Sequence, residues 1–118
     1  MKYVRIYTGP DNISHFEDVD VTLKQGPNSQ TSDPLNAESI IFGRIPADYT
    51  SSWHRAPCRQ FVIPLTGAME IEASDGEVRR IGAGEILLAE DTSGKGHITR
   101  AVGGEERLSV YVPLPESM

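Results

Sequence analysis

The chain has 118 residues, which is enough for one domain with a buried core and too few for a second core. Its formal net charge is −6, from 11 basic and 17 acidic residues, and its arginines are dispersed among carboxylates, so we expect no binding to nucleic acid or to an acidic membrane surface. The single cysteine excludes a disulfide within the chain, and no apolar run near Met1 has the length of a signal peptide or membrane span. We therefore expect a cytoplasmic protein.

The first third of the chain contains short strands and one polar loop. Residues 3–7 form the first predicted strand, and residues 16–23 alternate apolar with polar side chains at the period of two that a half-buried strand shows. A polar loop at 25–34 precedes a third strand at 39–45. We expect one domain spanning 1–118, in which the N-terminal strands and loop of 1–38 pad or extend a barrel core at 39–113.

The rest of the chain is a regular succession of short strands. They are predicted at residues 60–65, 68–73, 77–81, 85–89, 97–102 and 107–113. The pair Asp75-Gly76 predicts a two-residue hairpin turn, because Gly tolerates a positive φ. No segment of ten or more residues has a helical period. Repeated short strands with evenly spaced turns predict an all-β sandwich or barrel.

Two groups of residues resemble the paired sequence motifs of the cupins. The first cupin motif runs G-x5-H-x-H-x3,4-E-x6-G, and His54, Gln60 and Gly67 keep its spacing. The second runs G-x5-P-x-G-x2-H-x3-N, and Gly94 and His97 keep that spacing. The resemblance covers residues 53–112 and implies the cupin double-stranded β-helix, a jelly-roll β-barrel, in a small single-domain member with a degenerate metal motif.

Several motif positions carry other residues. Asp48 stands where the motif has its first Gly, Ala56 its second His, Gln60 its Glu, Thr92 its Pro and Ala101 its Asn. Gly84 lies two residues further from Thr92 than the pattern has it. The resemblance implies a divalent transition metal, Zn²⁺, Ni²⁺ or Fe²⁺, with His54, Gln60 and His97 as ligands. Because the carboxylate is missing, such a site is neutral and weak.

Other polar residues near the motifs have simpler interpretations. Asp91 is expected to accept hydrogen bonds from amides two or three residues further along its turn. The Glu90 side chain is a candidate to point to the mouth of the barrel. His15 is expected to lie at the surface or in an interface. Arg59 alternates with Gln60, so we expect it to face outward and pair with a carboxylate.

Two classes of function remain open. In the first, a small organic molecule binds in the barrel and is transformed by the candidate catalytic residues His54, Gln60 and His97. That chemistry uses either the weak metal site or metal-free imidazoles, which change charge near working pH and suit an isomerase or lyase. In the second, the chain is a non-catalytic ligand-binding or sensing cupin without metal. Separate structural roles would explain each histidine alone, but two histidines at paired motif positions favour one pocket.

The N-terminal strands also bear on assembly. Unpaired strand edges invite association, and residues 3–7 and 16–23 carry apolar side chains that need cover. We therefore predict a homodimer in which these strands cover a barrel edge of their own or of the other subunit.

Overall fold

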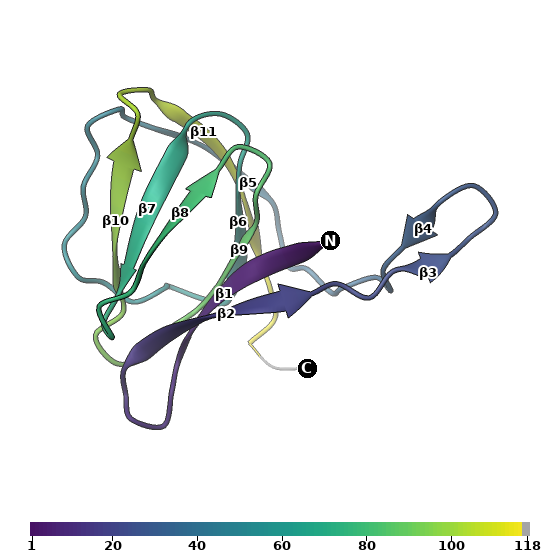
Figure 1. Ribbon diagram of the computed structural model, residues 1–118, viewed down its shortest axis with the longest axis horizontal. Coiled ribbons are helices and arrows are strands. Elements are labelled where there is room, and N and C mark those ends of the chain that lie inside the picture. The colour runs from purple at the N-terminus through teal and green to yellow at the C-terminus, as the bar shows by residue number, and fades with distance from the viewer. Residues whose placement is uncertain (117–118) are drawn as a thin grey trace.

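In the computed structural model, which describes residues 1–116, the chain forms strands and turns and contains no helix within those residues (Figure 1). The strands are β1 (Lys2–Thr8), β2 (Ser14–Asp20), β3 (Lys24–Gln25), β4 (Gln30–Thr31), β5 (Ile41–Ile45), β6 (Gln60–Pro64), β7 (Ala68–Ala73), β8 (Val78–Gly82), β9 (Leu87–Glu90), β10 (His97–Val102) and β11 (Arg107–Pro113). The all-β prediction is therefore confirmed. Over the described residues, no helix is long and apolar enough to cross a membrane.

The larger sheet has six strands in the order β2-β1-β9-β6-β11-β5. Its neighbouring strands run antiparallel except for β1 and β9, which run parallel with Ile6 opposite Ala89. The N-terminal strands thus extend a sheet of their own chain, which is one of the two arrangements expected for them. β5 and β2 are the two edge strands of this sheet.

The smaller sheet has three strands in the order β10-β7-β8. The irregular segment 49–54 runs along β10, where Ser51 N donates to Thr99 O at 2.9 Å and Ala101 N donates to Tyr49 O at 2.8 Å. Figure 1 shows this sheet facing the larger one. Ile71 of β7, Ile6 of β1 and the other members of the core cluster fill the space between them. Burial of these apolar side chains against each other holds the two layers together.

The predicted closed barrel at 39–113 is not formed within the described residues, since the two sheets share no strand pairing. At one junction between them, residues 46–59 make only isolated bridges with β10 in place of a ladder. Pro46 and Pro57 lie in this segment and lack the N–H group that a regular ladder needs. The result is an open, two-layered sandwich.

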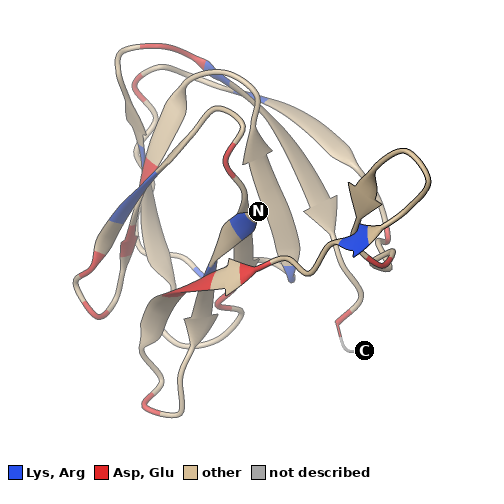
Figure 2. Cartoon of the chain, turned by 45° about the vertical axis from the view of Figure 1, so that its right-hand side comes forward, with Lys and Arg blue, Asp and Glu red and all other residues tan. Residues whose placement is uncertain are grey.

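The predicted polar loop at 25–34 contains a small hairpin. β3 and β4 pair there, and Figure 1 shows this hairpin projecting from the rest of the domain. Lys24 Nζ lies 3.0 Å from Asp33 Oδ2. Figure 2 shows basic residues interspersed with acidic ones along the chain, as in the exposed contacts of Arg79 with Asp18 and Glu77.

Candidate functional site

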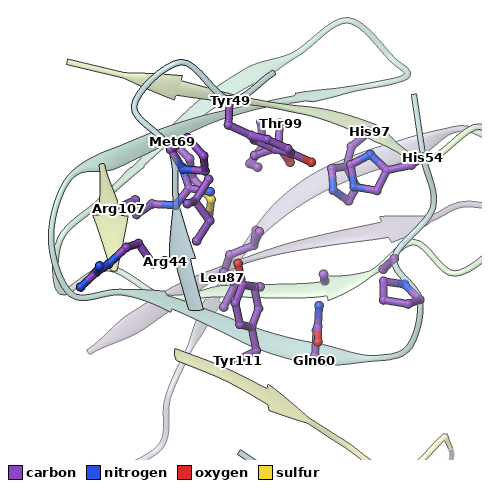
Figure 3. Close-up of a pocket in the computed structure, with 17 residues that line it drawn as sticks. Arg44, Tyr49, His54, Gln60, Met69, Leu87, His97, Thr99, Arg107 and Tyr111 are labelled. Atoms are coloured by element: carbon purple, nitrogen blue, oxygen red, sulfur yellow. The ribbon is translucent and has the colours of Figure 1, made fainter. Parts of the chain in front are cut away.

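A cavity of about 370 Å³ lies between the two sheets (Figure 3). Apolar side chains of the core, including Val62, Ile71 and Leu87, line part of it. Polar groups from three regions meet the same space: His97 of β10, Gln60 of β6 and His54 of the irregular segment. The three site residues predicted from the sequence therefore share one cavity.

His54 and His97 are neighbours in an antiparallel bridge between the irregular segment and β10. His54 N donates to His97 O at 3.0 Å, and His97 N donates to His54 O at 2.8 Å. The ring centroids are 4.5 Å apart with an interplanar angle of 58°. Gly96 makes this approach possible: its φ is +79°, and a Cβ there would lie 1.9 Å from His54 O. The backbone thus places the two imidazoles together.

Asp91 orients the His97 ring. Its carboxylate is fully buried, and Oδ2 lies 2.5 Å from His97 Nδ1. Because an ionised carboxylate only accepts, Nδ1 carries the proton and Nε2 keeps its lone pair. The prediction that Asp91 caps nearby amides is therefore wrong. In the Gly94-Lys95-Gly96 turn the chain bends back, and the carboxylate meets the ring of His97 instead.

His54 has the same tautomer for a different reason. Its Nδ1 lies 3.0 Å from the carbonyl oxygen of Ser52, so Nδ1 donates and Nε2 remains an acceptor. His54 is exposed at the entrance, whereas His97 is only 6% exposed. The pair therefore combines one buried imidazole with one that solvent reaches.

Gln60 begins β6 and reaches the cavity from the larger sheet, across from the imidazoles (Figure 3). Its Oε1 lies 3.9 Å from Cys58 Sγ, a weak contact that leaves its amide group available to a ligand. Among residues 1–116, no group of three or more His, Cys, Asp or Glu side chains is placed to hold a metal ion. The donors available here for a metal are two imidazoles and one amide oxygen.

Sequence reasoning missed a buried arginine in the wall of the cavity. Arg107 begins β11 and is 3% exposed, and its Nε and Nη1 atoms have no hydrogen-bond partner in the described part of the chain. Burial lowers the pKa of Arg107, and the nearby phenols of Tyr111 and Tyr49 act in the opposite direction. The strand period offered a signal, because Arg107, Ser109 and Tyr111 occupy alternate positions and share one face.

Glu90 and His15 lie away from this cavity. Glu90 lies 2.5 Å from Arg5 Nε and 2.5 Å from Arg59 Nε, and it does not line the cavity, so it is not at the mouth expected for it. Arg59 pairs with a carboxylate as predicted. Burial raises the pKa of Glu90, but the hydrogen bonds from both arginines outweigh it, and the pKa lies below its usual value. His15 contacts Asp11 and Asp75 at the surface, and its hydrogen bond with Asp11 raises the pKa of His15.

Comparison with known proteins identifies the fold alone. No family model and no curated protein matches the chain. Among solved structures, it is similar to the crystal structure of a conserved protein of unknown function from Streptococcus pyogenes, with 24% sequence identity and a TM-score of 0.51. The match covers 66% of this chain and 65% of that one. This likeness supports the all-β fold and assigns no activity.

Proposed function

We propose that this protein is a small cupin that binds a small organic molecule between its two sheets and transfers a proton to or from it through His97. The observation that carries the proposal is the contact of Asp91 Oδ2 with His97 Nδ1. A carboxylate behind an imidazole fixes the tautomer and stabilises the imidazolium that forms when Nε2 takes a proton.

The cupin assignment, with its jelly-roll fold, is supported by the backbone at the motif positions. Gly67, Gly84 and Gly94 all have positive φ values, of 70°, 81° and 72°. Residues other than glycine rarely adopt such a backbone conformation. His54 and His97 lie on adjacent stretches of chain, as the paired motifs imply. Two facing sheets with a cavity between them are also the layers of a jelly roll.

The size of the cavity favours a small ligand. Its 370 Å³ lies toward the lower end of the range of small-molecule sites. An apolar floor with a few polar groups is also the usual lining of such a site.

Proton transfer follows from the placement of the polar groups. His97 Nε2 accepts a proton from a C–H group next to a carbonyl, and the electron pair moves onto the carbonyl oxygen to give an enolate. The amide N–H of Gln60 donates to that oxygen. Return of the proton from His97 Nε2 to the same or the adjacent carbon completes an exchange or an isomerisation.

Exchange with heavy water tests this chemistry without knowledge of the physiological substrate. A panel of small ketones, aldehydes and oxo acids is incubated with the protein in D₂O, and deuterium incorporation next to the carbonyl is followed by NMR. We expect one or more compounds to exchange faster with the wild type than with His97→Asn, and a chelator to leave the rate unchanged. Ligand binding without any exchange would contradict catalysis and favour the sensing alternative.

Metal binding is the second candidate function for the same site, because two imidazoles with free Nε2 atoms face one cavity. His54, His97 and Gln60 would hold the ion, which as a Lewis acid would polarise a bound carbonyl. The donor set fits only a weak site, since the one buried carboxylate nearby, Asp91, is occupied by His97 Nδ1. Elemental analysis of the purified protein tests it, and Zn²⁺, Ni²⁺ or Fe²⁺ that is present in substoichiometric amount and removable by a chelator would favour it.

We further propose that the protein is a cytoplasmic homodimer. The edge strand β5 pairs only with β11, and the neighbouring Ile40, Ile41 and Phe42 are 58%, 50% and 76% exposed. An unpaired edge with adjacent apolar side chains is a surface that a second copy can cover. We therefore propose an interface at β5 and not at the N-terminal strands predicted from the sequence, because the apolar side chains of those strands pack within their own chain.

A further inference from the structure

We propose that the ligand of this cavity is a small organic carboxylate, whose negative charge binds beside Arg107 at the end remote from His97. This inference rests on the proposed function, because it names the class of molecule that the same cavity takes. Figure 3 shows Arg107 near one end of the cavity and the two imidazoles near the other.

The first support is the burial of a charge without a counter-charge. Arg107 is 3% exposed, and within residues 1–116 no carboxylate forms an ion pair with it. Its buried Nε and Nη1 atoms have no hydrogen-bond partner there either. A guanidinium buried without an anion destabilises a fold, because the hydrogen bond with Tyr111 and solvent in the cavity replace only part of its hydration. A ligand carboxylate supplies the missing charge and acceptors.

The second support is the character of the surrounding wall. Tyr111 and Tyr49 lie near the guanidinium and line the same cavity, so their phenol groups offer hydrogen bonds beside it. A phenol group offers hydrogen bonds, but it is not the carboxylate that would pair with a guanidinium. The tyrosines therefore shape a polar site around Arg107 without neutralising it.

The third support is the match with the chemistry at the opposite end. A carboxylate held at one end orients the rest of a short molecule toward His97 and Gln60. Such anchoring converts loose binding into one reactive pose, because the charged contact fixes the molecule's direction. The predicted ligand is thus a short oxo or hydroxy acid, with its carboxylate and its reactive group at different ends.

Titration calorimetry with matched probes tests the assignment on the full-length protein. The probes are oxo and hydroxy acids of about three to six carbons, their primary amides, and inorganic phosphate. We expect at least one acid to bind at least tenfold more tightly than its amide. Arg107→Met should weaken that acid about 10- to 100-fold, since a hydrogen bond to a charged group is lost. Arg80→Met removes an equal charge from the exposed face of β8 and should leave the affinity unchanged.

Stability provides a second readout on the same variant. Without ligand, Arg107→Met should unfold at a higher temperature than the wild type, because an unpaired buried charge is replaced by an apolar side chain of similar length. The wild type should gain more thermal stability from the acid than the variant does. An unfolding temperature that falls in Arg107→Met, with unchanged affinity for the acid, would show that Arg107 is structural and overturn the inference.

The remaining outcomes also decide the matter. Equal affinity for acids and amides, tight binding of phosphate alone, or no binding of any acid at millimolar concentration would overturn the carboxylate assignment. An equal loss of affinity in Arg80→Met would also overturn it, because the effect would then be one of overall charge. The proposed function fails separately, when no compound on the panel exchanges deuterium in a His97-dependent way.

Discussion

Asp91 and His97 form a buried pair at the inner end of the Gly-rich turn before β10, with Oδ2 2.5 Å from Nδ1. The pair has a direction, since Nδ1–H of His97 donates to the carboxylate and Nε2 is left as the acceptor nitrogen. The neighbouring His54 has its own Nδ1 acceptor in the carbonyl group of Ser52. Two imidazoles with the same tautomer therefore meet one cavity.

Asp91→Asn should slow the proposed proton transfer without unfolding the protein. Asn has nearly the volume of Asp, but its amide N–H donates to Nδ1 and favours the other tautomer of His97. We expect the deuterium exchange rate to fall about 100- to 10,000-fold, the range seen when a base loses its orienting carboxylate. An unchanged rate, with an unchanged circular dichroism spectrum, would exclude a positioning role for Asp91.

Gly96→Ala should be strongly destabilising. The new Cβ would lie 1.9 Å from His54 O, so the bridge between the two histidines must open. We expect the free energy of unfolding to fall by about 3 kcal/mol or more, as measured by urea denaturation. Gly84→Ala is the matched control, because its φ is also positive, at +81°, and its Cβ would meet nothing within 4 Å. It should cost about 1 kcal/mol, and equal costs at both positions would contradict the steric account.

Metal binding should be weak and should depend on the imidazoles. Titration calorimetry with Zn²⁺, Ni²⁺ and Fe²⁺ should show tighter binding to Gln60→Glu than to the wild type, because a carboxylate adds negative charge beside two neutral donors. His54→Ala should abolish the binding and leave the protein folded, since the apolar core does not need a metal. Absence of heat from both the wild type and Gln60→Glu would rule out the metal site.

Glu90 should contribute to stability in a pH-dependent way. The pKa of Glu90 in the folded protein lies below its ordinary value of 4.5. The ionised carboxylate therefore stabilises the fold at pH values above 4.5, and this contribution is lost as the pH falls through the lowered pKa. Glu90→Gln should lower the free energy of unfolding at pH 7 by about 1 kcal/mol, a modest figure because solvent screens the partly exposed arginines. The variant should also lose less stability than the wild type between about pH 5 and pH 3. Parallel stability curves for both proteins would contradict this role.

The homodimer predicts a mass near twice 12.9 kDa in light scattering. Phe42→Asp should convert the dimer to a monomer, because it places a charge in the proposed apolar interface at β5. Val78→Asp is a matched control, since Val78 is also an exposed apolar residue but lies on β8 in the other sheet. A monomeric mass for the wild type at high protein concentration would contradict the proposed homodimer.

The succession of strands was predictable from the sequence because it depends on local periods and turns. Alternation and the Asp75-Gly76 turn located most strands to within a few residues, whereas β3 and β4 lie in the segment predicted to be a polar loop. Closure of the sheets was not predictable in the same way, because it depends on how residues 46–59 lie against β10. The shared cavity of His54, Gln60 and His97 followed from motif spacing.

Asp91 and Arg107 were not predicted, for different physical reasons. The direction of the Asp91 side chain depends on the backbone of a turn in which Gly94 and Gly96 have positive φ values, and a sequence does not give those angles. For β11, the apolar set of Leu108, Val110 and Val112 is the one expected to face the core. The structure instead buries the alternate set that contains Arg107, and this arginine lines the cavity.

The tautomers of the two histidines test the central claim most directly, because they can be measured without knowing the ligand. Long-range ¹H–¹⁵N correlation spectra of the imidazole rings, recorded where both rings are neutral, distinguish a proton on Nδ1 from one on Nε2. We predict that His54 and His97 both carry it on Nδ1, and that Asp91→Asn moves it to Nε2 in His97 while His54 is unchanged. A wild-type His97 with its proton on Nε2 would contradict the account.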